Sequence, residues 1–265
     1  MAFSSFRGMQ STGVPQPIFH LDAGNTNSVS SGSSTTWANI ITAPADGSAQ
    51  TDYDADRTSS SVPSYQSPGA TAYFGNTTSA GNFNITPNTT FLNSLHKNNA
   101  LFTLVFLYFI GNVPGETQYL IGNMGTAGST TGLRFSVSPS STLTLEVYNS
   151  GASALSISSI GAISVNEISL LAVSVDEANG KVSFFATNAT DGNLSVAFTG
   201  QPYASPSSSD ATYSTNIMAA GNAESKIPDH VSNSHRMYQA MVFNQFLSQS
   251  QLSNIFNSQR SRYGV

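Results

Sequence analysis

The fold is decided by the stretch ISLLAVSV-DEANG-KVSFFA, which occupies residues 168–186. Its two ends are runs of apolar residues, and the Asn179-Gly180 pair between them is among the stronger local signals for a β-hairpin. The same pattern recurs at 133–148, where LRFSV and LTLEVY flank the turn residues SPSS. These alternations predict antiparallel strands joined by short turns.

Further strands are predicted on both sides of this stretch. Residues 18–22 (IFHLD) alternate apolar and polar side chains, and residues 194–198 (LSVAF) follow another turn at Asp191-Gly192. Residues 101–110 (LFTLVFLYFI) are apolar almost without a break, which indicates a strand buried on both faces. Many short strands without alternating helices predict an all-β sandwich or barrel with antiparallel pairing.

One helix is predicted, near the C-terminal end of the sequence. Ser248 and Gln251 have the spacing of a capping box, and Leu252, Ile255 and Phe256 form the i, i+3, i+4 stripe of an amphipathic helix. The helix is predicted to run from 248 to about 262, with 263–264 closing it. We expect it to pack its apolar stripe on the sandwich edge.

Composition excludes several classes of function. The 265 residues include no cysteine, which rules out disulfides, iron–sulfur clusters, thiolate zinc sites and cysteine nucleophiles. Charged residues make up only 9% of the chain, against about 25% in an ordinary soluble domain, and the net charge is −5. Because so few cations can neutralise a phosphate backbone, we predict no nucleic-acid partner.

The sequence also predicts no membrane span and no secretory signal. The longest apolar run, 101–110, is about half of the roughly 20 residues that a membrane-spanning helix needs. Residues 1–16 contain one arginine and lack the apolar core of a signal peptide. We interpret residues 1–17 as an N-terminal arm and residues 18–265 as one domain. The arm either docks on a neighbouring molecule or lies on its own domain, with assembly contacts expected from Phe3, Phe6, Arg7 and Met9.

The segment 237–252 (MYQAMVFNQFLSQSQL) resembles the closing motif of concanavalin A-like, or laminin G-like, jelly-roll domains. In that family a last strand containing Tyr-Asn or Phe-Asn leads into x-x-Leu-Ser and a short helix. Residues 21–25 (LDAGN) and 37–40 (WANI) are similar to the family's first strand and its Trp-x-Asp/Asn-Leu/Ile element, and 72–75 (AYFG) with Phe83 and Ile85 fit the following pair of strands. The resemblance implies an antiparallel two-sheet jelly-roll sandwich with a short C-terminal helix.

Two segments depart from the family pattern. The family's Trp-x-x-Val-Ala strand appears as ISLLAV at 168–173, without the tryptophan, and its Tyr-x-Asn-Gly hairpin appears as FFATNATDG at 184–192. Members of the family include lectins, glycan-cleaving enzymes, adhesion proteins and phage tail or capsid appendages, so the fold alone does not fix the function. The cysteine-free chain, rich in Ser, Thr, Asn and Gly, looks most like the phage members.

Three carboxylates at alternate positions, Asp52, Asp54 and Asp56, are weak calcium candidates. The stretch lacks the Gly and Glu that an EF-hand loop has at its sixth and twelfth positions, and solvated turn carboxylates are the alternative interpretation. His230 and His235 have no third partner in a recognisable zinc pattern, so a polar loop is favoured there. Calcium is therefore the one cofactor that the sequence leaves open.

No catalytic motif is evident in the sequence. Glycan-cleaving members of the family resemble one another in a strand bearing Glu-x-Asp-x-x-Glu, and retaining glycosidases need two carboxyl groups about 5–5.5 Å apart. The glutamates of this chain do not have that spacing, and we interpret Glu146 as a lone carboxylate on an exposed strand position. We predict that the protein is not an enzyme.

Tyrosines in polar, loop-like contexts are the remaining candidates for binding. An exposed tyrosine can stack on a sugar face or anchor a protein interface, because it offers rigid area at low entropic cost. Packing within a turn is the alternative for each of them. The candidate glycan or interface contacts are Tyr53, Tyr65, Tyr203 and Tyr213.

Two functions from different classes follow from these observations. The first is a non-enzymatic bacteriophage virion protein, a lectin-like jelly roll that decorates the capsid or a tail appendage and contacts other virion proteins, expected as a homo-oligomer and guessed as a trimer. The alternative is a carbohydrate-binding receptor or adhesion module that recognises a host surface glycan, with or without calcium. A glycan-cleaving enzyme is a distant third.

Overall fold

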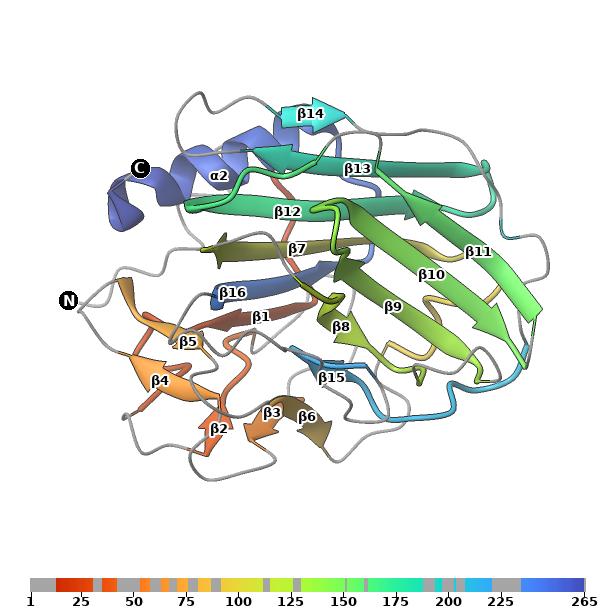
Figure 1. Ribbon diagram of the computed structural model, residues 1–265, viewed down its shortest axis with the longest axis horizontal. Coiled ribbons are helices and arrows are strands. Elements are labelled where there is room, and N and C mark those ends of the chain that lie inside the picture. Colours follow the sequence, from red (N-terminus) through yellow and green to blue (C-terminus); the bar gives the residue numbers. More distant parts are fainter. Residues whose placement is uncertain are drawn as a thin grey trace.

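Two antiparallel β-sheets lie face to face, and the C-terminal helix α2 (Gln249–Tyr263) covers the outside of one of them (Figure 1). This arrangement comes from a computed structural model. The structure describes residues 13–30, 35–41, 53–57, 63–66, 71–75, 81–86, 92–111, 115–125, 130–150, 152–159, 162–187, 194–196, 203, 208–220 and 235–264.

The first sheet has eight strands, with their bounds at β1 (Phe19–Asp22), β4 (Ser64–Gln66), β5 (Tyr73–Gly75), β7 (Leu101–Ile110), β12 (Glu167–Asp176), β13 (Lys181–Thr187), β14 (Leu194–Val196) and β16 (His235–Phe243). Their order is β14-β13-β12-β7-β16-β5-β4, and β1 also pairs with β16. The long strands β12, β7 and β16 therefore occupy its centre.

The second sheet also has eight strands, with their bounds at β2 (Thr36–Trp37), β3 (Asp54–Arg57), β6 (Phe83–Thr86), β8 (Gln118–Gly122), β9 (Gly132–Val137), β10 (Leu143–Asn149), β11 (Ala152–Ser158) and β15 (Asn216–Ile217). Their order is β11-β10-β9-β8-β15-β6-β3-β2. Two antiparallel sheets closed by a C-terminal helix confirm the predicted sandwich, and the strand order fits a jelly roll.

The predicted hairpins are present. Strands β12 and β13 pair from Leu170↔Thr187 to Asp176↔Lys181. Gly180 in the connecting turn has φ +63°, a left-handed conformation that glycine adopts without steric cost. Strands β9 and β10 pair as the sequence predicts, whereas β8 and β11 are strands that we did not predict. The two strands expected as a following pair, β5 and β6, lie in opposite sheets.

Strand β7 shows why a continuous apolar run is needed at the centre of the first sheet. Phe106 points into the main core between the two sheets, whereas its neighbour Val105 points to a second core beneath α2. The side chains of successive strand residues alternate between faces, so a strand with a core on each side is apolar at every position. The predicted burial of residues 101–110 on both faces is confirmed, with Leu101 at the exposed end.

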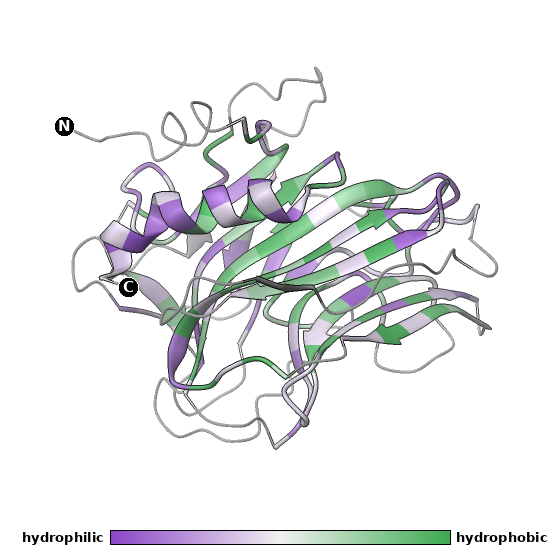
Figure 2. Ribbon diagram, turned by 90° about the horizontal axis from the view of Figure 1, so that it is seen from above, coloured by the Kyte–Doolittle hydropathy of each residue, from purple (hydrophilic) through white to green (hydrophobic). Residues whose placement is uncertain are grey.

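Helix α2 has the termini that the sequence predicts. The Ser248 side chain accepts a hydrogen bond from the Gln251 backbone N–H, and the Gln251 side chain accepts one from the Ser248 N–H at 2.9 Å, which completes the capping box. Gly264 closes the helix in a left-handed conformation. Leu252, Ile255 and Phe256 are buried against the outer face of the first sheet, over β12, β13 and β14, so the helix covers a face near the β14 edge (Figure 2).

The C-terminal end of α2 is tied to β1 and β16 by a buried polar network. Arg262 donates two hydrogen bonds of 2.7 Å to the carboxylate of Asp22, whose side chain is fully buried. Burial by itself would lower the pKa of Arg262, but the hydrogen bonds to Asp22, together with the charges of Asp22, Tyr263 and Tyr65, raise that pKa overall. Gln239 on β16 donates to Gln259 and to the Tyr263 hydroxyl, each at 3.0 Å. This network fixes where the helix ends on the sheet.

The described end of the arm lies against the same helix. Val14 is buried in the core beneath α2, and the Gln251 side chain donates a hydrogen bond of 3.3 Å to the Gly13 carbonyl. The predicted assembly residues lie outside the described residues; they are Phe3, Phe6, Arg7 and Met9. The division of the chain at residue 17 stays a prediction. In the described part of the chain, no helix has the length and apolar character to cross a membrane.

Candidate ligand-binding site

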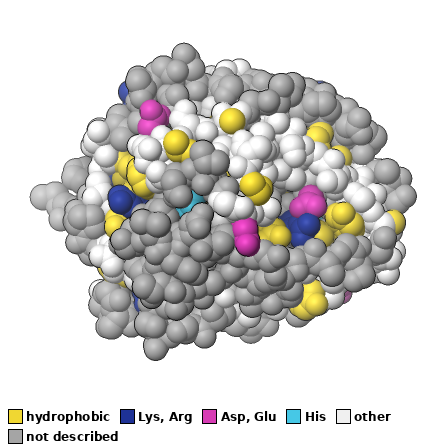
Figure 3. All heavy atoms as spheres, in the orientation of Figure 1, with side chains coloured by type: hydrophobic (Ala, Val, Ile, Leu, Met, Phe, Trp, Pro, Cys, Tyr) yellow, Lys and Arg dark blue, Asp and Glu magenta, His cyan; other side chains and the backbone are white. Residues whose placement is uncertain are grey.

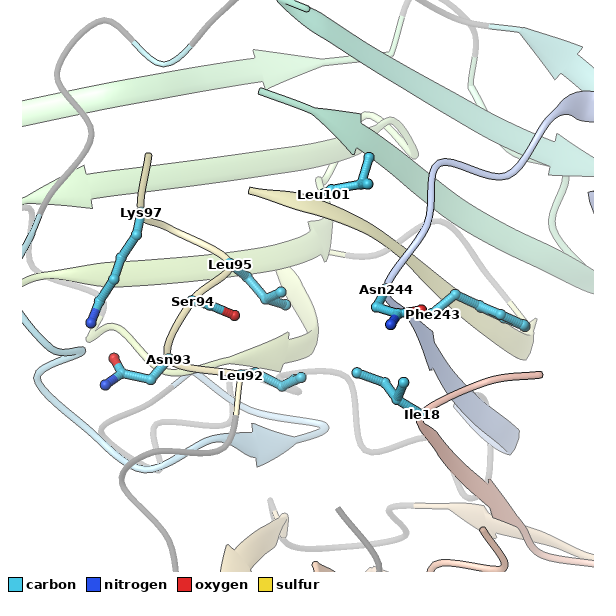
Figure 4. A pocket seen from close by; sticks show the side chains of 9 residues that line it. All are labelled: Ile18, Leu92, Asn93, Ser94, Leu95, Lys97, Leu101, Phe243 and Asn244. Atoms are coloured by element: carbon cyan, nitrogen blue, oxygen red, sulfur yellow. The ribbon is translucent and has the colours of Figure 1, made fainter. Parts of the chain in front are cut away.

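A pocket of about 310 Å³ opens where three segments of the chain meet at one end of the sandwich (Figure 4). One wall is the loop of residues 92–100, which leads into β7, and we call it the 92–100 loop. The opposite wall combines Ile18 before β1 with the end of β16 at Phe243 and Asn244. The complete lining consists of Ile18, Leu92, Asn93, Ser94, Leu95, Lys97, Leu101, Phe243 and Asn244.

The pocket lining combines five apolar residues with four polar ones, and Lys97 is the one charged residue among these nine. Figure 4 shows Leu92 and Ile18 pointing toward one another across the gap, with Leu95 and Ser94 directed from the loop toward the opposite wall. Leu101 is 45% exposed, the one large hydrophobic residue among those described that is exposed to this degree. The pocket lining thus combines apolar surface with the hydroxyl of Ser94 and the amides of Asn93 and Asn244.

The one charged residue of the lining, Lys97, is already paired. Its ammonium lies 2.8 Å from the carboxylate of Asp210, and in Figure 4 its side chain points away from the opposite wall. The hydrogen bond to Lys97 lowers the pKa of Asp210, with a further contribution from Asn93. The pocket therefore presents no uncompensated charge to a ligand, and it suits a neutral molecule or the neutral part of a larger one.

The 92–100 loop has unusual backbone geometry. Leu92 and Asn99, near its two ends, both have φ +59°. This left-handed region costs a residue other than glycine roughly 1–2 kcal/mol, so such conformations persist only where surrounding contacts hold them. Asn tolerates the region better than most residues, but a leucine does not, and the Leu92 side chain lines the pocket.

The contacts that hold this backbone come from several other elements. The Asn99 N–H donates to Glu177 in the β12–β13 turn at 2.7 Å, and Glu177 returns a backbone hydrogen bond to the Ala100 carbonyl at 2.9 Å. Tyr203 donates from its hydroxyl to the Leu95 carbonyl at 2.9 Å. Tethers from distant segments make the loop a preformed wall, which lowers the entropic cost of binding.

Residues 209–211 add a further set of tethers behind the loop. Asn93 accepts a hydrogen bond of 2.6 Å from the Ala211 N–H, and a ring nitrogen of His96 lies 2.9 Å from the Ser209 carbonyl oxygen. His96 is fully buried, and burial lowers its pKa, although the bond to Ser209 acts in the opposite direction. A neutral His96 is therefore part of the scaffold of the pocket.

The four candidate tyrosines do not gather at this pocket. Tyr203 is 4% exposed and belongs to the main core, so its expected role as an exposed contact is wrong: it supports the 92–100 loop from behind. Tyr65 is half-buried, with its hydroxyl on the Ala23 carbonyl at 3.1 Å, and Tyr53 packs partly against the core. Tyr213 is partly exposed, and its backbone N–H is bonded to Asn123.

Two of the three calcium candidates have other partners. Asp54 accepts a hydrogen bond of 2.8 Å from the Asn39 N–H, and Asp56 accepts one of 2.7 Å from the Thr36 hydroxyl, so both hold the segment around β2 in place. Asp52 lies outside the described residues, as does His230. Over the described residues, no three histidines or carboxylates come together as a metal-binding group. Calcium binding stays a prediction.

Glu146 is not a lone carboxylate. On the outer face of the second sheet it forms a two-bond ion pair with Arg134 of the adjacent strand, and both side chains are mostly buried, at 15% and 11% exposure. The Arg134 guanidinium also lies over the ring of Tyr119 at 5.4 Å. Figure 3 shows a basic and an acidic side chain side by side among hydrophobic ones on the face over this sheet. Sequence alone gave no signal for the pair, because the strand register brings it together.

The pocket itself was also missed from the sequence. Its walls come from three segments separated by up to about 225 residues, and in the sequence the leucines of the 92–100 loop look like ordinary apolar residues. The one local clue was a group of large apolar residues, Phe91, Leu92 and Leu95, in a mostly polar stretch, TTFLNSLHKNNA at 89–100, which is not a strand or helix pattern.

Comparison with solved structures places the fold among lectin-like sandwiches. Trypanosoma rangeli sialidase matches over 97% of this chain and 38% of its own, with 14% identity and a TM-score of 0.55. The same enzyme in complex with 2,3-difluorosialic acid matches over 98% and 39%, with 16% identity and a TM-score of 0.56. Botulinum neurotoxin type C, whose cell entry depends upon interaction with two ganglioside molecules, matches over 96% and 52%, with 14% identity and a TM-score of 0.58.

Neither a protein-family model nor a curated protein sequence matches the chain. The chain spans less than two fifths of the sialidase chains and about half of the neurotoxin chain. None of these three neighbours is a virion protein, so the predicted virion role and location stay predictions. At 14–16% identity the likeness concerns architecture alone, and the chain has the fold of the lectin-like β-sandwich domains found in these proteins.

Proposed function

We propose that this chain is a carbohydrate-binding domain that holds the neutral part of a glycan in the pocket beside the 92–100 loop, and that it binds without cleaving. The observation that carries the proposal is the preformed pocket, whose lining combines five apolar residues with four polar ones. Small-molecule sites combine apolar lining with a few placed polar groups in this way. A sugar ring suits such a lining, because its apolar C–H faces can pack against apolar side chains and its hydroxyl groups can bond to polar ones.

The fold adds support to this choice over the virion role. The structurally similar proteins include an enzyme bound to a sialic acid derivative and a toxin that interacts with gangliosides. A similar fold does not show that two proteins bind the same ligand. The proposal therefore rests on the pocket, and the similarity of fold is additional support. No feature of the described residues favours assembly into a virion in particular.

The non-catalytic part of the proposal rests on how the described carboxylates are used. Glu146 is bonded to Arg134, Asp22 to Arg262, and Glu177 to the backbone of the 92–100 loop. Asp210 beside the pocket is paired with Lys97. Most retaining and inverting glycosidases need two carboxyl groups that flank the scissile bond, with sialidases, which use a tyrosine nucleophile, as an exception. The carboxylates named above each hold a separate part of the scaffold.

The test is binding of the purified chain to an immobilised panel that includes lactose, α2,3-sialyllactose and neutral oligosaccharides. Ser94 is exposed at the pocket, so Ser94→Trp places a bulky ring in the opening without disturbing the core. We expect wild-type binding to at least one neutral glycan and a loss of at least about tenfold, or about 1.4 kcal/mol, in Ser94→Trp. Incubation with the bound glycan is expected to release no product.

Ser140→Trp is the matched control, because Ser140 is an exposed turn serine between β9 and β10, away from the pocket lining. It should bind as the wild type does. Equal binding by a folded Ser94→Trp variant, or no binding to any glycan of the panel, would contradict the proposal. Release of a monosaccharide would overturn its non-catalytic part. Repeating the assay with a chelator tests the calcium alternative, which predicts loss of binding.

A further inference from the structure

The four strands that end the two sheets differ in length. The first sheet ends in β14 and β4, each of three residues, and the second sheet ends on one side in β2, of two residues. Very short edge strands are one of the ways in which proteins prevent unwanted pairing with another chain. Strand β11 is the exception, since it has seven residues.

Two of the other common protections are also missing from strand β11. Its sequence, ASALSIS, contains no charge and no proline, both of which discourage edge pairing. Among the described residues, its hydrogen-bonded strand partner is β10 alone, and none of its residues has a further bond on the open side. A shift in register beside Tyr148 disturbs the start of the strand, so the regular part runs from Leu155 to Ser158.

The strand register shows which backbone groups of β11 face the open side. The Ser159 N–H donates to the Leu143 carbonyl at 2.8 Å, and hydrogen-bonded pairs alternate with non-bonded pairs along an antiparallel ladder. Ile157, which is opposite Leu145, therefore bonds to β10 through its backbone. The backbone N–H and C=O groups of Ser156 and Ser158 point to the open edge.

We propose that β11 pairs with β11 of a second copy of this chain, in antiparallel orientation, so that the second sheets of two molecules join into one continuous sheet. Placing Ser156 opposite Ser158 of the second copy, and the reverse, pairs all the edge-facing groups of these residues. Ile157 then lies on the two-fold axis. This interface contains none of the residues that line the pocket beside the 92–100 loop.

Three features favour a second copy over another partner. The strand carries no charge, so no like charges meet when it faces itself. The exposed side chains of Ser156 and Ser158 are hydroxyls, which both donate and accept hydrogen bonds and so can pair with their own kind. Ile157 is partly buried against the main core, and its copy across the axis would cover its remaining exposed surface. A two-fold interface of this kind gives a dimer, where the sequence suggested a trimer.

The test is sedimentation velocity of the full chain over a concentration series. We expect the mass of the wild type to approach twice 27.8 kDa as concentration rises. Ser156→Pro removes an N–H that faces the open edge and none that bonds to β10, and proline is tolerated at such edge positions. That variant should stay at the monomer mass, whereas Ser156→Ala, which keeps the N–H, should dimerise as the wild type does.

A second pair of variants guards against misfolding of the proline variant. Ser158→Lys adds a charge on the edge strand β11, and Thr144→Lys adds the same charge on the neighbouring strand β10. Each substitution also removes the 2.9 Å hydrogen bond between the Ser158 and Thr144 side chains, so the two variants are matched in that respect. Ser158→Lys should weaken dimerisation by more than Thr144→Lys does. A wild type that stays monomeric or sediments as a trimer, or folded Ser156→Pro and Ser158→Lys variants that both dimerise normally, would overturn the proposal.

Discussion

The two sheets of this sandwich are built alike but are covered differently. The first sheet has the main core on one face and a second core under α2 on the other, so its central strands are buried over most of their length. The second sheet has the main core on one face only, and strand β10 alternates buried and partly exposed residues along its length. The difference teaches that the first sheet serves as the scaffold, whereas the second sheet and the end loops offer surface for binding.

The polar clusters follow the same division. Arg262 and Asp22 join the last helix to the first strand across 240 residues of sequence, and the carboxylate is fully buried. Arg134 and Glu146 join two neighbouring strands of the second sheet and keep some exposure. The Arg262–Asp22 pair holds the C-terminal helix against the first strand. The Arg134–Glu146 pair reinforces a strand register that the β9–β10 hairpin already specifies.

The largest effect is expected from uncovering the outer face of the first sheet. Phe256 is 1% exposed beneath α2, and Phe256→Ala should lower the free energy of unfolding by about 3–5 kcal/mol, because it removes a buried ring and leaves a cavity. Tyr148→Ala, on the partly exposed outer face of the second sheet, should cost less than half as much. Urea unfolding of both variants measures the difference. Equal losses would contradict the division between the two sheets.

A somewhat smaller contrast is expected between the two ion pairs. Arg262→Ala leaves the fully buried Asp22 carboxylate without its partner, so it should cost about 3 kcal/mol of unfolding free energy. Arg134→Ala leaves Glu146 partly exposed to water and should cost about 1–2 kcal/mol. Thermal and urea unfolding at neutral pH report both values. A larger loss in Arg134→Ala would reverse the roles that we assign to the two pairs.

The smallest effect is a dependence of stability on pH that comes from two buried histidines. Burial lowers the pKa of His20, against the opposing charge of Asp22, and burial also lowers the pKa of His96. Below the ordinary value of 6.5, the unfolded chain therefore binds more protons than the folded chain. The free energy of unfolding should fall as pH decreases through 6.5, by at most about 1.4 kcal/mol per pH unit for each histidine.

Unfolding curves between about pH 7.5 and 5.5 test this prediction, because most carboxylates stay ionised in that range. His20→Gln should remove part of the slope while His96 retains the rest. A stability that is constant over the range, or one that rises as pH decreases, would show that these histidines are protonated in the folded chain.

The sequence predicted the first sheet better than the second for a physical reason. Strands with a core on each side carry an unbroken apolar signal, as residues 101–110 do, and the capping box of α2 is a local pattern. Strand β11 was missed because its residues are mostly Ser and Ala, whose propensities indicate little, and its status as a strand comes from pairing with β10. The buried role of Tyr203 was missed because its partner, the Leu95 carbonyl, is 108 residues away.

The binding site could not be predicted because it depends on tertiary contacts. Leu92 lines the pocket in a left-handed conformation, which contacts with distant segments hold in place, and no local pattern specifies that geometry. The Arg134–Glu146 pair likewise depends on the register of two strands. Sequence reasoning therefore gave the class of binding protein as an alternative, and the structure supplied the location that we propose.

Titration of the isotopically labelled chain with a neutral glycan that it binds, followed by amide chemical shifts, tests the central claim most directly. We expect the largest shifts in the 92–100 loop, at Leu101 and at Asn244, with the outer faces of both sheets unchanged. Shifts confined to the outer face of the second sheet, or spread evenly without a maximum at the pocket, would contradict the account.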